Sequence, residues 1–288
     1  MLDIFGCPMH CGVGEKGLVH SLDYLNTHDT SLQFTTIPEV SVPEESSAHL
    51  KRFNSVLETC TAIAEYSYNN ILSKGNTPLF LGGDHSAAIG TVSATATQYN
   101  NIGLIWIDAH PDINTDLTSA SGNIHGMPIS ALLGNLSPAG EKLSKILTDN
   151  PKVKPENIVH IGLRDIDPPE AVILKELNVK HFTYDDIKEK GLDACLNEAI
   201  AHLSHLEHIH LSFDIDVVNP QLLPGVSVPV NDGFTIPEIY HVFERLLGEL
   251  PISALDIMEY NKEYDKNDVT ADFVSELIAF IQKHFHSV

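Results

Sequence analysis

Short apolar runs alternate with longer helical patterns along almost the whole chain, and this alternation restricts the possible folds more than any other feature. The apolar runs are nearly continuous, without regular polar interruptions, which is typical of parallel strands covered on both faces of their sheet. The runs that we interpret as strands are Leu2–Phe5, Thr77–Leu81, Ile102–Ile107, Asn157–Ile161, His181–Thr183, His208–Phe213 and Ile252–Ile257. The sequence therefore predicts an α/β fold with a mostly parallel sheet.

Helical patterns occupy the segments between these runs. One has a typical start, because Thr235-Ile236-Pro237-Glu238 places threonine at the N-cap and proline and glutamate in the first turn. The clearest patterns cover Ser47–Lys74, Ser86–Gln98, Ser137–Thr148, Leu192–Leu206, Ile236–Leu247 and Val269–His284. No linker rich in proline, glycine or serine and no internal repeat divides the 288 residues. We therefore expect residues 1–288 to form a single three-layer α/β/α domain.

The composition is that of a folded and strongly acidic protein. A hydrophobic content of 43% and a charged content of 19% argue against disorder. The formal net charge is -22, so the surface repels phosphate backbones and anionic lipids, and we expect neither nucleic acid nor membrane as a partner. The charge favours a cationic small molecule or metal ions, although most of it serves solubility. No apolar run reaches the roughly 20 residues of a membrane span and no signal peptide is visible, which predicts a cytoplasmic protein.

The four cysteines indicate no disulfide framework. Cys7, Cys11, Cys60 and Cys195 form no CxxC pair and do not belong to a small secreted chain, so we expect reduced thiols. A metal clip at Cys7-Pro8-Met9-His10-Cys11 is the alternative. One short turn does not supply a complete tetrahedral ligand set, which disfavours the clip.

Two carboxylates and a histidine stand at every second position directly after one predicted strand. Asp108, His110 and Asp112 follow the run Ile102–Ile107, so they lie at the carboxyl end of that strand, where open parallel sheets bind ligands. The alternative is an acidic loop with N-cap aspartates, but the regular spacing on one side of an extended segment disfavours it. Carboxylates with a few imidazoles suit Mn²⁺, whereas a set of histidines and cysteines would indicate zinc.

Two further motifs follow other predicted strands. Asp214 and Asp216 follow the run His208–Phe213; such a pair can also be a simple cap, but no Lys or Arg stands nearby, so bound cations would balance its charge. His85 follows Gly82-Gly83, where a lone histidine is more often structural, and only the other motifs make it a candidate ligand. Two divalent ions at such a site share a water, lower its pKa toward neutrality and supply a hydroxide nucleophile without serine or cysteine.

A site of this kind also needs a proton shuttle and a group that holds the substrate. His125 ends the polar loop Ser119–His125, and a histidine with a pKa of about 6.5 is a natural shuttle. Glu259 follows the last apolar run, so its carboxylate reaches the same edge of the sheet. There it could hold a planar cation by two parallel hydrogen bonds.

Three motifs of the chain resemble, in order, the metal motifs of the ureohydrolase superfamily, and the chain is most similar to its arginases. These motifs are Gly82-Gly83-Asp84-His85-Ser86, Asp108-Ala109-His110-Pro111-Asp112 and Ser212-Phe213-Asp214-Ile215-Asp216. The similarity runs over nearly the whole chain and is weakest at both termini. It implies two Mn²⁺ ions, one held by His85, Asp108, Asp112 and Asp214 and the other by Asp108, His110, Asp214 and Asp216.

The same resemblance implies roles in catalysis. His125 matches the proton-shuttling histidine of the family, Glu259 matches the glutamate that faces the substrate guanidinium, and Asp112 belongs to the catalytic set as a metal ligand. Asp108 and Asp214 would bridge the two ions.

The likeness to arginase, as opposed to agmatinase, comes from three other segments. These are Asp112–Thr115, Ser121–Gly126 and Gly162–Pro168. The resemblance implies that Asn114 and Ser121 contact the substrate α-carboxylate, with Asp167 and Glu170 near the α-amino group. Agmatine lacks that carboxylate and would leave the donors without an acceptor.

Several positions depart from the arginase pattern. Ser119 and Ala120 stand where arginases often carry threonines, Val228 removes a hydroxyl beside the site, and Asp116 adds a negative charge near the expected carboxylate contacts. Formimidoylglutamate, agmatine and other guanidino compounds are therefore alternative substrates. An inactive binding or regulatory member is disfavoured because every expected ligand is present, and deacetylation would rest on fold analogy alone.

The sequence thus predicts an enzyme that hydrolyses L-arginine to L-ornithine and urea, through attack of a metal-bridged hydroxide on the guanidinium carbon. Its expected partner is a small cationic guanidino substrate. Arginase-like proteins are commonly trimers or hexamers, so the resemblance also implies a homo-oligomer.

Overall fold

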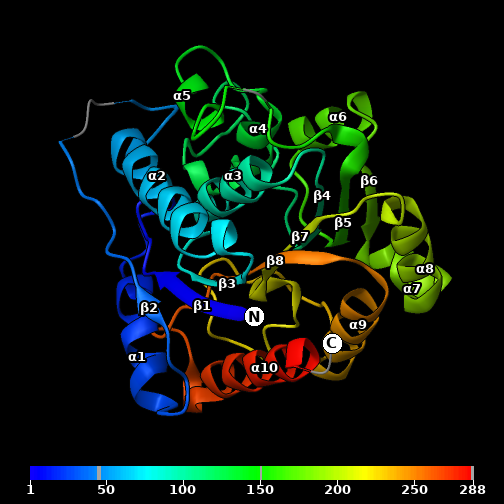
Figure 1. Cartoon of the computed structure of the whole chain (residues 1–288). Helices are drawn as coiled ribbons and strands as arrows, with labels where there is room; N and C mark the ends of the chain where they lie inside the picture. Colours follow the sequence, from blue (N-terminus) through cyan, green and yellow to red (C-terminus); the bar gives the residue numbers. More distant parts are fainter. Residues whose placement is uncertain (44–46, 150, 287–288) are drawn as a thin grey trace.

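Eight strands pair in parallel to form one sheet in the computed structural model, which describes residues 1–43, 47–149 and 151–286. Their order across the sheet is β2-β1-β3-β8-β7-β4-β5-β6 (Figure 1). The strands are β1 Leu2–Cys7, β2 Thr35–Thr36, β3 Thr77–Gly82, β4 Gly103–Ile107, β5 Ile158–Leu163, β6 Lys180–Thr183, β7 Ile209–Asp214 and β8 Ile252–Met258. Seven of them match the predicted runs to within a few residues. The exposed two-residue strand β2 carries no apolar signal and was not predicted.

Helices cover both faces of this sheet (Figure 1). They are α1 Ser21–His28, α2 Phe53–Asn70, α3 Ala88–Gln98, α4 Pro128–Leu133, α5 Glu141–Ser144, α6 Pro168–Glu176, α7 Tyr184–Lys190, α8 Leu192–Leu203, α9 Ile236–Glu249 and α10 Val269–His286. Side chains of β4 alternate between the two faces: Leu104 and Trp106 pack in one apolar core with α2 to α6, and Ile105 and Ile107 in another with α1 and α7 to α10. The predicted three-layer α/β/α fold class is confirmed, and the observed strand pairings are all parallel.

Two predicted helices were too long. The pattern Ser47–Lys74 forms a helix only from Phe53, because Arg52 has a left-handed backbone conformation with φ of 55°, which a right-handed helix does not continue through. The pattern Ser137–Thr148 contains only the four-residue helix α5. Leu147 there is also left-handed, with φ of 61°.

Four short helices were not predicted, namely α1, α4, α6 and α7. They have between six and nine residues, too few for a clear helical period. Local start signals were nevertheless present for two of them. Asp167 and Glu170 begin α6, and Thr183 and Asp186 begin α7, each pair standing three residues apart as in a capping box.

The four cysteines are buried and form no disulfide, as expected. Among the described residues, no helix is both long and apolar enough to cross a membrane.

The arrangement of the sheet brings distant parts of the chain together. Strands β3, β8, β7 and β4 are neighbours in that order, and because they are parallel their carboxyl ends meet at one edge. His85 follows β3, Glu259 follows β8, Asp216 follows β7 and Asp108 follows β4. The fold therefore places the motifs singled out in the sequence at a common edge.

Candidate metal and substrate site

A cavity of about 220 Å³ opens at this edge of the sheet. It is lined by His85, His110, Asp112, Asn114, Ser119, Ala120, Ser121, His125, Gly126, Asp165, Asp167, Glu170, Asp214, Asp216, Val228 and Glu259. Seven of these side chains are carboxylates, and none of the described lining residues is Lys or Arg. The cavity is therefore suited to positively charged ligands.

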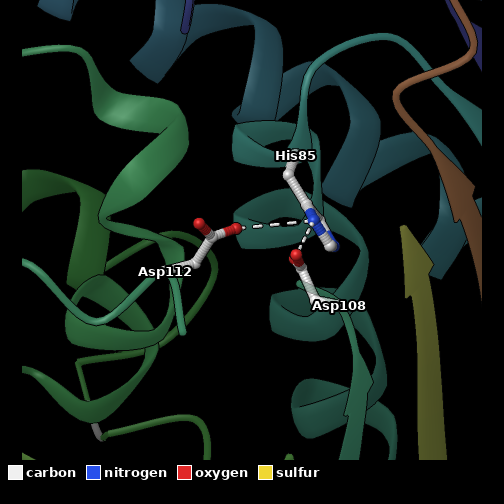
Figure 2. Close-up of side chains that lie close together, drawn as sticks. All are labelled: His85, Asp108 and Asp112. Carbon is white, nitrogen blue, oxygen red and sulfur yellow. Dashed lines mark ion pairs between the residues drawn. The ribbon is translucent and has the colours of Figure 1, made fainter. Parts of the chain in front are cut away.

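At the inner end of the cavity, three carboxylates surround one nitrogen of His85. Its Nδ1 atom lies 3.0 Å from Oδ2 of Asp108 and 3.4 Å from Oδ2 of Asp112, and Figure 2 shows both carboxylates pointing toward the imidazole ring. Oδ2 of Asp214 lies 3.0 Å from the same nitrogen. These atoms converge as ligands of one cation would.

A second group shares Asp108 with the first. Nδ1 of His110 lies 3.4 Å from Oδ1 of Asp108 and 3.0 Å from Oδ2 of Asp216. Asp108 thus turns one oxygen to His85 and the other to His110.

Two sets of three residues each have ligand-type atoms that lie within 4.8 Å of one another. One set is His85, Asp108 and Asp112, and the other is Asp108, His110 and Asp216. No other such set of three occurs among the described residues. The alternative metal clip at residues 7–11 therefore has no support in the described part of the chain.

Two residues of the site have left-handed backbone conformations. Asp112 has φ of 50° and Glu259 has φ of 68°, in a region that non-glycine residues seldom adopt. Such conformations persist where the surrounding structure imposes them, and they are concentrated at functional sites. In this chain they occur at a candidate ligand and at the carboxylate expected to face the substrate.

The electrostatics of the site favour bound cations. Burial and repulsion from Asp108 raise the pKa of Asp112, and burial together with Asp216 and Asp108 raises the pKa of Asp214. Burial alone would lower the pKa of His85, but Asp108 and Asp214 outweigh it and raise that pKa. Divalent cations would relieve the repulsion among these carboxylates, so the donor set fits such ions.

Two residues to which the sequence analysis gave no role contact the candidate ligands. Trp106 donates from Nε1 to Oδ2 of Asp108 at 3.0 Å, and its ring stacks on His85 with centroids 3.9 Å apart. Oγ of Ser212 lies 2.9 Å from Nε2 of His85. Trp106 and Ser212 each precede a ligand-type aspartate by two positions, so the period of a strand could have identified them.

Glu259 and His125 lie side by side in the lining of the cavity. Oε1 of Glu259 accepts a hydrogen bond from the backbone N–H of His85 at 2.9 Å and lies 3.8 Å from Nδ1 of His125. Oε2 of Glu259 is buried and has no hydrogen-bond partner among the described residues. Buried carboxylate oxygens are normally paired, so this atom is available to a donor that enters the cavity.

The residues expected at the far end of the substrate line the same cavity. Asn114 donates from Nδ2 to Oδ2 of Asp167 at 3.0 Å. Oγ of Ser121 accepts from the backbone N–H of Asn123 at 3.2 Å and lies 3.4 Å from Oγ of Ser119. These contacts keep three polar side chains in place around the outer part of the cavity.

Glu170 is tied to the backbone on both sides. Its oxygens accept from the N–H groups of Ile113 at 3.2 Å and of Asp167 at 3.1 Å. Burial raises its pKa to about 7. Glu170 therefore fixes the segment after Asp112 and the start of α6 in addition to lining the cavity.

Asp116 lies elsewhere than its position in the sequence suggested. It is buried, accepts hydrogen bonds from the N–H at 2.9 Å and the hydroxyl of Ser137, and is not among the residues that line the cavity. The prediction that Asp116 places a negative charge beside the α-carboxylate contacts is therefore wrong. Asp165, in contrast, does line the cavity, with Oδ2 at 3.7 Å from Nε2 of His110.

Comparisons with known proteins show what the chain is similar to. The model of the Arginase family matches residues 5–281. The arginase of Bacillus caldovelox is 37% identical over 291 residues, which cover 96% of each chain. Among solved structures, the arginase of Bacillus cereus has a TM-score of 0.86 at 33% identity, covering 96% of both chains. The arginase of Entamoeba histolytica, solved in complex with L-ornithine, has a TM-score of 0.86 at 25% identity, covering 97% of both.

Proposed function

The chain belongs to the arginase family and is an arginase-type ureohydrolase, and on this premise we propose that it hydrolyses L-arginine to L-ornithine and urea with two Mn²⁺ ions. The observation that carries the choice of a guanidino substrate is the unpaired, buried Oε2 atom of Glu259 at the wall of an acidic cavity. The cation that satisfies it must be small enough for a cavity of about 220 Å³.

Six side chains would hold the metal ions. One ion would be bound by His85, Asp108, Asp112 and Asp214, and the other by Asp108, His110, Asp214 and Asp216. Carboxylates with two imidazoles and no thiolate support manganese over zinc. When bound, a pair of such ions lowers the pKa of a water toward neutrality and so supplies a nucleophile at physiological pH.

Glu259 would hold the guanidinium group. Its Oε1 atom is already fixed by the backbone of His85, so the carboxylate cannot rotate freely. Its Oε2 atom would accept a charge-assisted hydrogen bond from one guanidinium nitrogen, and the remaining capacity of Oε1 would accept from a second. The guanidinium carbon would then be presented to the side of the cavity that carries Asp112, Asp214 and Asp216.

His125 would move the protons of the reaction. Hydrolysis breaks the bond between the guanidinium carbon and the side-chain nitrogen, and that nitrogen must gain a proton as it leaves. His125 lies on the cavity wall, is partly exposed, and has Nδ1 at 3.8 Å from the carboxylate that would hold the guanidinium. It is thus placed to take protons from solvent and deliver them to the departing amine.

The outer part of the cavity would select an amino acid. The hydroxyl of Ser121 and the second Nδ2 proton of Asn114 would donate to an α-carboxylate, and Asp167 with Glu170 would lie near the α-amino group. The Entamoeba histolytica arginase was solved with L-ornithine, which has both groups. A substrate without the carboxylate would lose about 1–3 kcal/mol for each donor left unpaired.

The test is a substrate panel with purified, manganese-loaded protein. We expect urea from L-arginine, far less urea from agmatine, and no formamide from formimidoylglutamate. Glu259→Gln should lower kcat/KM for L-arginine by about 10- to 100-fold, because a charged hydrogen bond worth about 1.5–3 kcal/mol is weakened.

Glu263→Gln is the matched control. The substitution is chemically the same, and Glu263 is exposed and lies outside the cavity. Release of formamide from formimidoylglutamate, with no urea from L-arginine, would show that formimidoylglutamate and not arginine is the substrate. Full activity of Glu259→Gln would contradict the role given to this carboxylate.

A further inference from the structure

Ser121 and His125 lie on a segment with little regular structure, residues 119–126, which we call the 119–126 loop. Its tip packs against the residues that precede α2. A Cβ atom added to Gly122 would lie 2.0 Å from the carbonyl oxygen of Ala48, and the carbonyl of Gly122 accepts from the N–H of Lys51 at 2.9 Å. The loop thus depends for its position on a part of the chain that does not line the cavity.

Arg52, the next residue, connects this contact to a third segment. Its Nε atom donates to the carbonyl of Cys11, and its Nη2 atom donates to the side-chain oxygen of Asn123 at 2.9 Å and, at 3.4 Å, to the carbonyl of Gly12. One guanidinium group therefore ties the start of α2, the turn at residues 11–12 and the middle of the 119–126 loop together. Only arginine has several donors in a fixed planar arrangement that can do this.

The same contacts lead directly to the candidate site. The backbone N–H of Asn123 donates to Oγ of Ser121 at 3.2 Å, and the carbonyl of Gly12 accepts from the N–H groups of Ile124 at 3.0 Å and His125 at 3.4 Å. Two of the three residues that Arg52 holds therefore lead to the site: Asn123 is one hydrogen bond from Ser121, and Gly12 is one hydrogen bond from the backbone of His125.

The turn at residues 11–12 is itself fixed to the metal motif. The N–H of Gly12 donates at 2.8 Å to Oδ2 of Asp84, the residue before His85. Asp84 also accepts from the N–H of Ser86 at 3.1 Å. The anchor for the 119–126 loop is thus joined to the same framework that positions a candidate metal ligand.

We propose that Arg52 is a positioning residue of the active site, which sets the place of Ser121 and His125 through the 119–126 loop without touching the substrate. The roles of Ser121 and His125 are those of the proposed function, so this inference rests on it. Loss of the guanidinium would leave the metal ligands in place and let the loop move. Misplacement of catalytic groups by about 1 Å costs roughly 100-fold in rate.

The test compares Arg52→Lys, which keeps the charge and removes the planar donors, with Asn123→Ala, which removes the acceptor. We expect each to raise KM for L-arginine and lower kcat, with kcat/KM falling about 10- to 100-fold, while the protein still binds as much manganese as the parent. The double variant should lose little more than Arg52→Lys alone, because both changes break one contact. Arg245→Lys on α9 is the control, because this arginine bonds Asp193, Asn197 and Glu249 outside the cavity. The KM of this variant for L-arginine should not change.

Hydrogen exchange provides a readout that does not depend on turnover. Backbone amides of residues 119–126 should exchange faster in Arg52→Lys and in Asn123→Ala, with no change in β4. A lower melting temperature with unchanged KM, kcat and loop exchange would show that Arg52 is only structural and would overturn the proposal. If the parent protein releases no urea from L-arginine, the proposed function fails, and the exchange measurement still decides whether Arg52 holds the loop. If Arg52→Lys does not fold, Asn123→Ala decides it by the same criteria.

Discussion

Asp256 on β8 is a buried carboxylate on which three hydrogen bonds converge. Its Oδ2 atom accepts from the hydroxyls of Thr91 at 2.9 Å and Ser212 at 3.2 Å, and lies 2.7 Å from Nε2 of His210. Because the Ser212 hydroxyl donates to Asp256, its oxygen is left to accept from Nε2 of His85 at 2.9 Å. With Nε2 engaged by Ser212, Nδ1 is the nitrogen of His85 that would bind a metal ion.

The size of the effect of Asp256→Ala follows from these contacts. Hydrogen bonds to a charged group contribute about 1.5–3 kcal/mol each, so three of them contribute about 4.5–9 kcal/mol. Removing the carboxylate also removes the several kcal/mol that its burial costs. The net loss should resemble that of breaking a buried pair, about 3–5 kcal/mol of the free energy of unfolding. The weakened support of His85 should reduce manganese affinity by about 10- to 100-fold.

The measurements are denaturation in guanidinium chloride of the metal-free protein and calorimetric titration with Mn²⁺. Asp193→Ala on α8 is the control; its carboxylate contacts His241 and Arg245 but is exposed, so it should cost less than about 1 kcal/mol. A loss below about 1 kcal/mol in Asp256→Ala would refute the stability argument. Unchanged manganese affinity would refute the link through Ser212.

Two further predictions concern metal removal and pH. Chelation of metal should lower the free energy of unfolding, and Mn²⁺ at 100 times its Kd should restore about 2.7 kcal/mol for each site; an unfolding transition that does not respond to Mn²⁺ would contradict the metal assignment. Burial lowers the pKa of Lys152 from its ordinary value of 10.5 to about 8. Between these pH values the unfolded chain binds the extra proton, so stability should rise as pH increases from 8 toward 10.5. Lys152→Met should lack this contribution, and equal pH slopes for the two proteins in denaturation experiments would disprove it.

The predictable part of this protein is the part that depends on neighbours in sequence. The run before Asp108 is buried on both faces and therefore nearly continuous in apolar residues, so the strand β4 and its end were recognisable. The spacing of Asp108, His110 and Asp112 is likewise local, and all three lie at the candidate metal site. The short helix α6 was missed because nine residues give little periodicity, although Asp167 and Glu170 mark its start.

The helix starting at Phe53 shows where local patterns fail. Residues 47–52 continue the helical pattern of α2, but Arg52 is left-handed and its side chain bonds the turn at residues 11–12 and Asn123. These partners are 41 and 71 positions away. A contact of that kind overrides helical preference and leaves no trace in a local window.

The sequence by itself determined the strands other than β2, the covered sheet and the candidate metal-binding motifs, since burial and spacing act within a few residues. Only the tertiary structure decided which side chains meet. The order of strands brings Glu259 to the backbone of His85, 174 positions away, and leaves one of its oxygens unpaired at the cavity. Folding of the connection between β4 and β5 places Asp116 against Ser137, outside the cavity lining. The physical reason is that the neighbours of a strand in a sheet depend on long-range packing, which no local pattern encodes.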